Sequence, residues 1–362
     1  MTDPFAEVAG AVLDDIGPLH FGSPHREQRE LAAGRAVAVL GDRSVLSVTG
    51  PDRLTWLDSI TSQSVAALAP GESTELLVLD PQGHVEHAAS VVDDGTTTWL
   101  IVDRDRSAAL LAWLVRMRFR LRVDPQDAGE THRVVGGTAA AIAALAAVAT
   151  WTDPWPRVAP GGWGYAPADP HPGTERDWAE AIVDLAQYAE LAADAAAAGD
   201  GPTRLAGRLA ADALRVAAWR PRAAAEADGR TLPHEVDWLR TAVHLEKGCY
   251  RGQETVAKVH NLGHPPRRLV ALQLDGSADV LPAAGAEVLA HGEPVGAVTS
   301  VARHYEDGPI ALALVRRTVA DDALLTVRTD DGEIAAAAET IVPPDAGRTA
   351  AVPRLPRLSR RR

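Results

Sequence analysis

The sequence predicts an α+β protein that ends in a small antiparallel β-barrel, and three observations support this class. The N-terminal part alternates short apolar runs of strand length with amphipathic stretches of helical period, which is typical of mixed α and β layers. Short apolar runs between residues 269 and 327 follow at regular spacing with Gly or Pro between them, as in small barrels. Of the 362 residues, 46% are hydrophobic, so the chain can fill the cores of two or three domains.

Residues 1–124 are predicted to form the first of two α+β lobes. Near the start, Val8, Val12 and Ile16 share one face of a predicted short helix. Asp94-Gly95 predicts a tight hairpin between two strands. The predicted strands of this lobe are 36–40, 44–48, 75–80, 84–92 and 98–102, and its predicted helices run from Gly50 to before Pro70 and from about Ser107 to Phe119.

Residues 125–264 are predicted to form the second α+β lobe, interleaved with the first. Residues 151–165 are rich in Trp, Pro and Gly. This composition fits either the wall of a ligand site or a packed irregular loop, and both interpretations stay open. The predicted elements of the lobe are a strand at 133–137, an Ala-rich helix at 138–150, and helices at about 175–198 and 203–218.

Residues 265–343 are predicted to form the barrel, and residues 344–362 a basic disordered tail. The barrel strands are expected at 269–274, 286–289, 295–300, 310–315 and 324–327. The tail carries six arginines from Arg348 onward. Such a tail is most often only a solvated segment, although a contact with RNA or an acidic partner is a second interpretation.

Charge and composition exclude several classes of protein. A formal net charge of −13 argues against a general nucleic-acid binder. A single cysteine rules out an internal disulfide framework and an all-cysteine metal or cluster site within one chain. The acidic N-terminus lacks the pattern of a secretion signal, and no apolar stretch is long enough to span a membrane. The protein is therefore expected to be soluble and cytoplasmic.

The densest chemistry of the chain surrounds its single cysteine, Cys249. Lys247 and Arg251 flank it, and nearby positive charge favours the thiolate over the thiol. Gly248 and Gly252 bracket it, so the backbone there can take φ > 0 or approach a partner closely. A lone cysteine can also be a small buried packing residue, but this surrounding pattern favours a functional thiol.

The segment from Lys247 to Lys258 resembles the signature of a known family. Residues 247–254 read K-G-C-Y-R-G-Q-E and residues 256–258 read V-A-K. This pattern is similar to the K-G-C-Y-x-G-Q-E-x-V-A-R signature of the YgfZ-type folate-binding proteins, with Lys258 in the arginine position. These proteins are relatives of the glycine-cleavage T-protein, an aminomethyltransferase. Similar elements at 48–53, 79–84 and in the predicted barrel extend the resemblance over about residues 20 to 342.

The resemblance implies a three-lobed ring, made of both α+β lobes and the barrel, whose central opening binds tetrahydrofolate or another reduced folate. Cys249 is then the key thiol. Glu235, in an L-P-x-E segment, is a candidate partner of the pterin edge. Arg267 is a candidate partner of the anionic folate tail. Alternatively, Glu235 is a surface acid, and Gln253 and Glu254 cap the next element. The candidate cofactor-binding residues are Lys247, Tyr250, Gly252, Gln253, Glu254, Glu235 and Arg267, and no metal site is predicted.

Two departures from the family pattern bear on the reaction. The catalytic aspartate of the T-protein falls near His87 or Ala88 of this chain. The family element L-R-x-E-A-G corresponds to residues 214–219, where Ala217 replaces the acidic residue and Trp219 replaces the glycine. The first change argues against aminomethyl transfer by the T-protein route. The second implies that the family's pterin-contacting acid is missing here or is supplied by another part of the chain.

Three functions remain open. The resemblance favours a folate-binding accessory protein for the assembly or repair of iron–sulfur enzymes, including radical enzymes that modify tRNA. Its expected partners are folate and iron–sulfur clients or assembly proteins, with no membrane and no general nucleic-acid binding. The alternatives are a tetrahydrofolate-dependent aminomethyl or methyl transferase, and a non-catalytic scaffold for protein interactions. Whether the protein turns over a substrate is left open.

Overall fold

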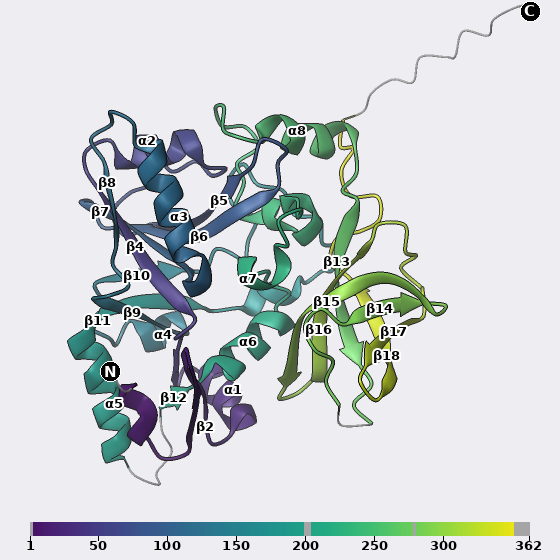
Figure 1. The fold of residues 1–362 in the computed structure, drawn as a ribbon, viewed down its shortest axis with the longest axis horizontal. Coiled ribbons are helices and arrows are strands. Elements are labelled where there is room, and N and C mark those ends of the chain that lie inside the picture. The colour runs from purple at the N-terminus through teal and green to yellow at the C-terminus, as the bar shows by residue number, and fades with distance from the viewer. Residues whose placement is uncertain (1–2, 199–203, 278–279, 351–362) are drawn as a thin grey trace, which may run out of the picture.

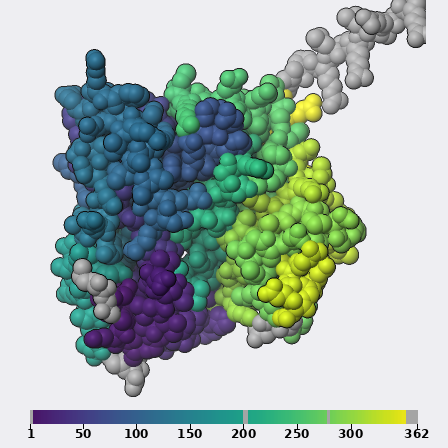
Figure 2. Space-filling view, viewed as in Figure 1, coloured from purple at the N-terminus to yellow at the C-terminus, as the bar shows by residue number. Residues whose placement is uncertain are grey.

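The structure is a computed structural model that describes residues 3–198, 204–277 and 280–350. Two five-stranded sheets and a closed barrel surround a central group of helices (Figure 1). The space-filling view places the first sheet and its helices (blue) at the upper left and the barrel (yellow-green) at the right (Figure 2). The predicted α+β class is confirmed. Within the described residues, no helix is both long and apolar enough to cross a membrane.

The first sheet is antiparallel and carries two helices on one face. Its strands, in spatial order, are β5 (Ser73–Leu79), β6 (Val85–Asp93), β7 (Thr97–Asp103), β4 (Arg43–Thr49) and β8 (Asp124–Asp127). Helices α2 (Arg53–Ile60) and α3 (Arg104–Met117) bury their apolar sides against alternate strand residues such as Leu46 and Val48. The other face, which includes Val45 and Ile101, packs in one core with Trp151 and Ile182 of the second sheet.

The second sheet draws strands from distant parts of the chain. Its order is β10 (Ala149–Thr152), β11 (Ala179–Asp184), β9 (His132–Gly137), β3 (Val37–Val39) and β12 (Leu205–Ala206). Strand β3 precedes the whole first sheet in sequence, yet it pairs with β9 and β12. The adjacent runs predicted at 36–40 and 44–48 therefore enter different sheets. Helix α1 (Pro24–Ala32) and helix α5 (Leu185–Ala197) also belong to this half of the molecule.

Several predicted helices are wrong or shorter than expected, and the helix predicted from Gly50 to before Pro70 spans only α2. The N-terminal stretch forms a short 3-10 helix, η1 (Pro4–Glu7), and a hairpin of β1 (Ala11–Asp14) and β2 (Gly17–Phe21), because paired backbones and the Phe5–Phe21 ring contact outweigh its helical spacing. Residues 179–184 form β11 rather than helix, since they pair on both sides. The Ala-rich segment is helical only in α4 (Ala139–Ile142), after which the chain continues into β10.

The predicted antiparallel barrel is confirmed, but the strand that closes it, β18 (Gly332–Thr340), lies beyond the five predicted runs. Its six strands are all antiparallel and form a ring, β13-β16-β15-β14-β17-β18. Alternate residues such as Val270, Leu272 and Val315 fill its interior. The strands are β13 (Arg267–Leu274), β14 (Glu287–Ala290), β15 (Glu293–His304), β16 (Gly308–Arg316), β17 (Leu325–Thr329) and β18 (Gly332–Thr340).

Short helices connect the two sheets to the barrel. A single core joins Leu77 of β5, Trp238 and Leu312 of β16, so all three parts pack together at the centre. Ala346 belongs to the same core and Thr349 donates to the carbonyl of His260, so residues 344–350 of the predicted tail contact the folded part. Residues 351–362 of that tail lie outside the described residues. The connecting elements are η2 (Pro172–Glu175), α6 (Arg208–Ala217), α7 (Ala223–Glu226), η3 (Pro233–Val236), η4 (Trp238–Arg240) and α8 (Gln253–Leu262).

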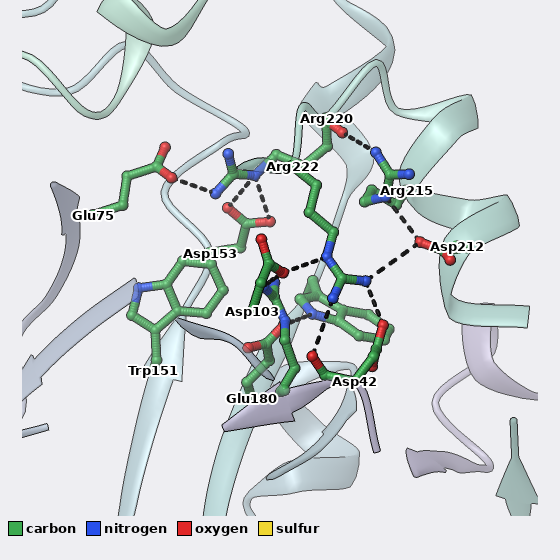
Figure 3. A network of polar contacts seen from close by, with 12 residues as sticks. Asp42, Glu75, Asp103, Trp151, Asp153, Glu180, Asp212, Arg215, Arg220 and Arg222 are labelled. Carbon is green, nitrogen blue, oxygen red and sulfur yellow. Dashed lines mark hydrogen bonds and ion pairs between the residues drawn. The ribbon is translucent and has the colours of Figure 1, made fainter. Parts of the chain in front are cut away.

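Buried ion pairs fix the segment after α6 to both sheets (Figure 3). Arg220 lies 2.7 Å from Glu75 of β5 and 3.2 Å from Asp153. Arg222 lies 2.6 Å from Asp103 at the end of β7 and also pairs with Asp42. Because each arginine meets carboxylates from other parts of the chain, the network sets how the parts are placed. Its contribution to net stability is small, since desolvation offsets the attraction.

Candidate functional site

The loop that carries Cys249 packs against the turn between β5 and β6. Gly252 has φ +84°, and a Cβ atom there would lie 2.6 Å from the carbonyl oxygen of Asp80. On the opposite side, a Cβ atom on Gly83 would lie 2.9 Å from Cβ of Thr255 in α8. These close approaches require glycine at both positions. The two motifs that were separate in the sequence therefore form one structural unit.

The loop makes a direct prediction for its two glycines. Gly252→Ala is expected to lower the free energy of unfolding by about 2–4 kcal/mol, because alanine resists φ +84° and its methyl group would collide with a backbone oxygen. Gly248→Ala is the matched control, since nothing lies within 4 Å of its would-be Cβ. Urea unfolding of both variants measures the difference. Equal midpoints for the two variants would contradict the packing described here.

Lys247 is buried and binds backbone carbonyls at the end of α2. Its side chain is 4% exposed, and its Nζ lies 3.6 Å from the carboxylate of Asp58. The ammonium donates to the carbonyl oxygens of Asp58 at 2.5 Å, Thr61 at 3.0 Å and Gln63 at 2.8 Å. A cation at the C-terminal end of a helix satisfies carbonyls that the helix leaves unpaired. Burial lowers the pKa of Lys247, while Asp58 opposes that shift.

Arg251 is also directed away from the thiol. Its guanidinium lies 2.5 Å from Glu86 of β6, with a second contact at 3.4 Å. Among the described residues, the hydrogen bonds and ion pairs of Lys247 and Arg251 thus all go to groups other than Cys249. Cys249 itself is exposed, which excludes the interpretation as a buried packing residue. Lys247 and Arg251 thus hold the loop in place, and the Cys249 thiol between them is exposed to solvent.

The other motif residues also have internal contacts. Tyr250 is 8% exposed and belongs to the central core, and burial raises its pKa. Gln253 donates to the carbonyl of Lys247 at 3.3 Å and closes the loop. Glu254 is exposed in the first turn of α8, where a carboxylate is favoured by the helix dipole.

Glu235 and Arg267, both predicted to contact folate, are paired with each other. Glu235 has no exposed surface, and it accepts from the Arg267 guanidinium at 2.8 Å and from the Arg267 backbone at 3.0 Å. Arg267 also lies 2.6 Å from Asp228, and these carboxylates raise its pKa despite burial. The pair joins η3 to the first barrel strand. A folate contact through the buried Glu235 would require this pair to open.

A cleft of about 610 Å³ lies beside the anchored loop, between β6, α3 and residues 227–229. Its carboxylates each have a side-chain partner: Asp80 lies 2.9 Å from Nδ1 of His84, and Glu86 and Asp228 pair with the arginines described above. The lining residues are Asp80, Val85, Glu86, His87, Arg106, Trp113, Arg116, Ala227, Asp228 and Gly229.

Two arginines on α3 give this cleft an excess of positive charge. Arg106 donates to the carbonyl of Ala227 at 2.9 Å, and neither Arg106 nor Arg116 has an ion pair within the part of the chain that the structure describes. Sequence reasoning missed both residues. The available signal was their spacing with Trp113, since positions i, i+7 and i+10 share one helix face.

His87 lines the same cleft with an unsatisfied ring nitrogen. Its Nδ1 is buried and has no hydrogen-bond partner among the described residues. Burial lowers the pKa of His87, Glu86 opposes this shift, and Arg106 and Arg116 add to it. A neutral imidazole at neutral pH follows, in the region where the resemblance placed the aspartate of the T-protein. The cleft can therefore offer two guanidiniums and one neutral imidazole to a ligand.

Trp219 keeps the backbone expected of a glycine. Its φ is +56°, in the left-handed region that bulky residues rarely adopt. The indole is 6% exposed and lies 5.6 Å from the His171 ring, which in turn meets Trp155 at 5.7 Å. The position that resembled a family glycine has thus retained its turn, while the side chain fills the space around it.

Comparison with known proteins gives the same overall picture. The family described as the glycine cleavage T-protein C-terminal barrel domain matches residues 267–344. A relative from Mycosarcoma maydis, named iron-sulfur cluster assembly factor IBA57 homolog, mitochondrial, is 25% identical over 65% of this chain and 56% of its own length. A relative of the same name from Neurospora crassa is 25% identical over 73% of this chain and 60% of its own length. The chain thus spans little more than half of these relatives.

A solved structure confirms the fold. The crystal structure of glycine cleavage system aminomethyltransferase T from Bartonella henselae superposes with a TM-score of 0.69, at 18% identity, over 92% of this chain and 94% of that chain. The fold is therefore that of the T-protein. The resemblance to iron–sulfur cluster assembly factors related to the T-protein, first drawn from the cysteine signature, is confirmed by the relatives.

Proposed function

We propose that this protein, which is similar to iron–sulfur cluster assembly factors and has the T-protein fold, supports the assembly or repair of iron–sulfur enzymes through the thiol of Cys249. One observation carries the proposal: Cys249 is exposed on a loop that is fixed at Lys247 and at Gly252. A rigid loop presents a reactive group at a defined position, which transient contact with a client requires. Radical enzymes that modify tRNA are proposed as clients.

A single thiol suits a transient role better than a resident cluster. Conventional clusters need about four cysteine ligands, and this chain has one cysteine. Cys249 would lose its proton and act as one ligand to iron of a client or assembly partner, then be displaced. The compartment follows from neither fold nor thiol. Both relatives are mitochondrial by name, and a cytoplasmic location stays a prediction.

Cys249→Ser tests the thiol. Because Cys249 is exposed, we expect the variant to keep its free energy of unfolding within about 0.5 kcal/mol. In cells that lack the native protein, however, the variant should restore iron–sulfur enzyme activity to a small fraction of the level given by the unaltered chain. Equal restoration by both proteins would refute the thiol role and favour the scaffold alternative.

Reduced folate is the proposed ligand of the cleft beside the loop. The cleft volume of about 610 Å³ lies within the range of small-molecule sites. A folate carries carboxylates on its glutamate tail, which suit the guanidiniums of Arg106 and Arg116. The neutral imidazole of His87 would face the uncharged part of the ligand. This placement assigns the folate contacts to α3 and β6 rather than to the buried Glu235–Arg267 pair.

Anaerobic titration with tetrahydrofolate, followed by tryptophan fluorescence and calorimetry, tests the cleft. We expect the double variant Arg106→Gln/Arg116→Gln to bind at least about tenfold more weakly, since each charged hydrogen bond is worth about 1.5–3 kcal/mol. Arg157→Gln, an exposed arginine of another loop, is the matched control. Unchanged affinity in the double variant would refute this location. Turnover of an aminomethyl donor with folate bound would instead favour the transferase alternative.

A further inference from the structure

The C-terminal end of α3 and the turn that follows it expose an unusual mixture of apolar and basic side chains. Phe119 is 78% exposed, Val115 49% and Leu121 44%. Arginines alternate with these residues along the chain. We call this surface the α3 patch, and it consists of Val115, Arg116, Arg118, Phe119, Arg120 and Leu121. It belongs to the first-sheet lobe, which lies on the opposite side of the molecule from the barrel (Figure 2).

The backbone holds Phe119 in place at an energetic cost. Its φ is +46°, which is rare for a bulky residue and costs about 1 kcal/mol or more. Burial of the ring does not offset this cost, because most of the ring faces solvent. The turn is closed instead by hydrogen bonds of its backbone: the Leu121 N–H donates to the Arg118 carbonyl at 3.0 Å, and the Arg122 N–H donates to the carboxylate of Asp52 at 2.9 Å. The fold thus presents an apolar anchor outward at a defined position.

The charges around the ring indicate the kind of partner. Arg118 lies 3.5 Å from Asp124, in an exposed pair that contributes little. Arg120 has no ion pair within the described ranges of the chain, and Arg116, at the edge of the cleft, has none either. These cations stand out on a chain with a net charge of −13. A surface with unpaired guanidiniums around an exposed apolar anchor is complementary to carboxylates next to apolar side chains.

We propose that the α3 patch docks an acidic, apolar segment of a partner protein, with Phe119 as the apolar anchor and Arg120 as the main cation. A nucleic acid fits less well, because Val115 and Leu121 are aliphatic and offer no stacking face for bases. The proposal is independent of the thiol and shares only Arg116 with the proposed folate site, and a client enzyme or an assembly protein would qualify as the partner.

A defined probe tests this docking surface in the full-length protein. The probe is a fluorescein-labelled 16-residue acidic peptide with Leu at i, i+3, i+4 and i+7 and Glu elsewhere. We expect saturable binding by fluorescence anisotropy, weakened at least tenfold by Phe119→Ser and by Arg120→Glu. The matched controls are Leu324→Ser, whose side chain is 84% exposed on the barrel, and Arg157→Glu, and both should bind as the unaltered chain does.

Four outcomes of the binding experiment would overturn the proposal. These are no peptide binding at millimolar concentration, equal binding of a polyglutamate of the same length, and loss of binding in the control variants. The fourth is binding of a 16-nucleotide oligouridine that Phe119→Ser abolishes while peptide binding is unchanged, which would identify a nucleic-acid surface. Sedimentation of the unaltered protein and of Phe119→Ser gives an independent check. If the unaltered protein is a dimer and the substitution converts it to a monomer, the patch binds a second copy of this chain, and the proposal is refuted.

Discussion

Replacing Lys247 by methionine is expected to lower the free energy of unfolding by about 3 kcal/mol or more, because a buried donor to backbone carbonyls is lost. Methionine keeps much of the apolar stem but leaves the carbonyl oxygens of Asp58, Thr61 and Gln63 without their donor. Lys247→Arg should lose much of the same stability, since a planar fork replaces a compact ammonium among converging oxygens. Urea unfolding measures both changes.

Lys258→Met is the matched control for this experiment. Lys247 and Lys258 are the two lysines of the chain, and both belong to the cysteine signature. Lys258 is exposed on α8, so its substitution should change stability by no more than about 0.5 kcal/mol. If Lys247→Met were as stable as Lys258→Met, the carbonyl-binding role would be refuted. In cells, Lys247→Met should also impair iron–sulfur enzyme activity although Cys249 is intact, because the loop that presents the thiol loses its anchor.

Trp219→Ala is expected to lower the free energy of unfolding by about 3–5 kcal/mol, the usual cost of removing a buried tryptophan side chain. Trp219→Gly should be less harmful by up to about 1 kcal/mol, because glycine adopts a left-handed backbone without strain. We therefore expect Trp219→Gly to be more stable than Trp219→Ala, because the backbone at this position has a φ of +56°. Thermal or urea unfolding of the two variants gives the order directly.

The control for this order is Trp113, which is 6% exposed like Trp219 but lies within α3. In a helix, glycine is less favourable than alanine by about 1 kcal/mol. Trp113→Gly should therefore be less stable than Trp113→Ala, the reverse of the order at Trp219. If the glycine variant were less stable than the alanine variant at both positions, the turn at Trp219 would relax when the indole is removed.

The barrel and the class of fold could be predicted from sequence because they depend on local patterns. Runs such as 269–274 and 310–315 have strand length and lie between Gly and Pro, and both became barrel strands. The need for glycine at Gly252 was also visible in the motif, and its φ of +84° agrees. Where two local patterns competed, as at residues 179–184, strand pairing on both sides decided the outcome.

The partner of each charged side chain could not be predicted from sequence. Lys247 and Arg251 beside Cys249 suggested activation of the thiol, but their partners come from the end of α2 and from β6, far away in the chain. Glu235 and Arg267 looked like separate ligand contacts and became one internal pair. The cleft itself combines α3, β6 and residues 227–229.

The sequence by itself determined the α+β class, the closed barrel, the glycine that the cysteine loop requires and the resemblance to iron–sulfur assembly factors. Only the tertiary structure decided that β3 joins the second sheet, that Cys249 is exposed and that Arg106 and Arg116 face a cleft. The reason is physical: periodicity and turn residues act over a few positions, so a short stretch of sequence is enough to reveal them. Burial and ion pairing depend on which distant segments meet, and identical side chains can then anchor a loop, join two domains or line a site.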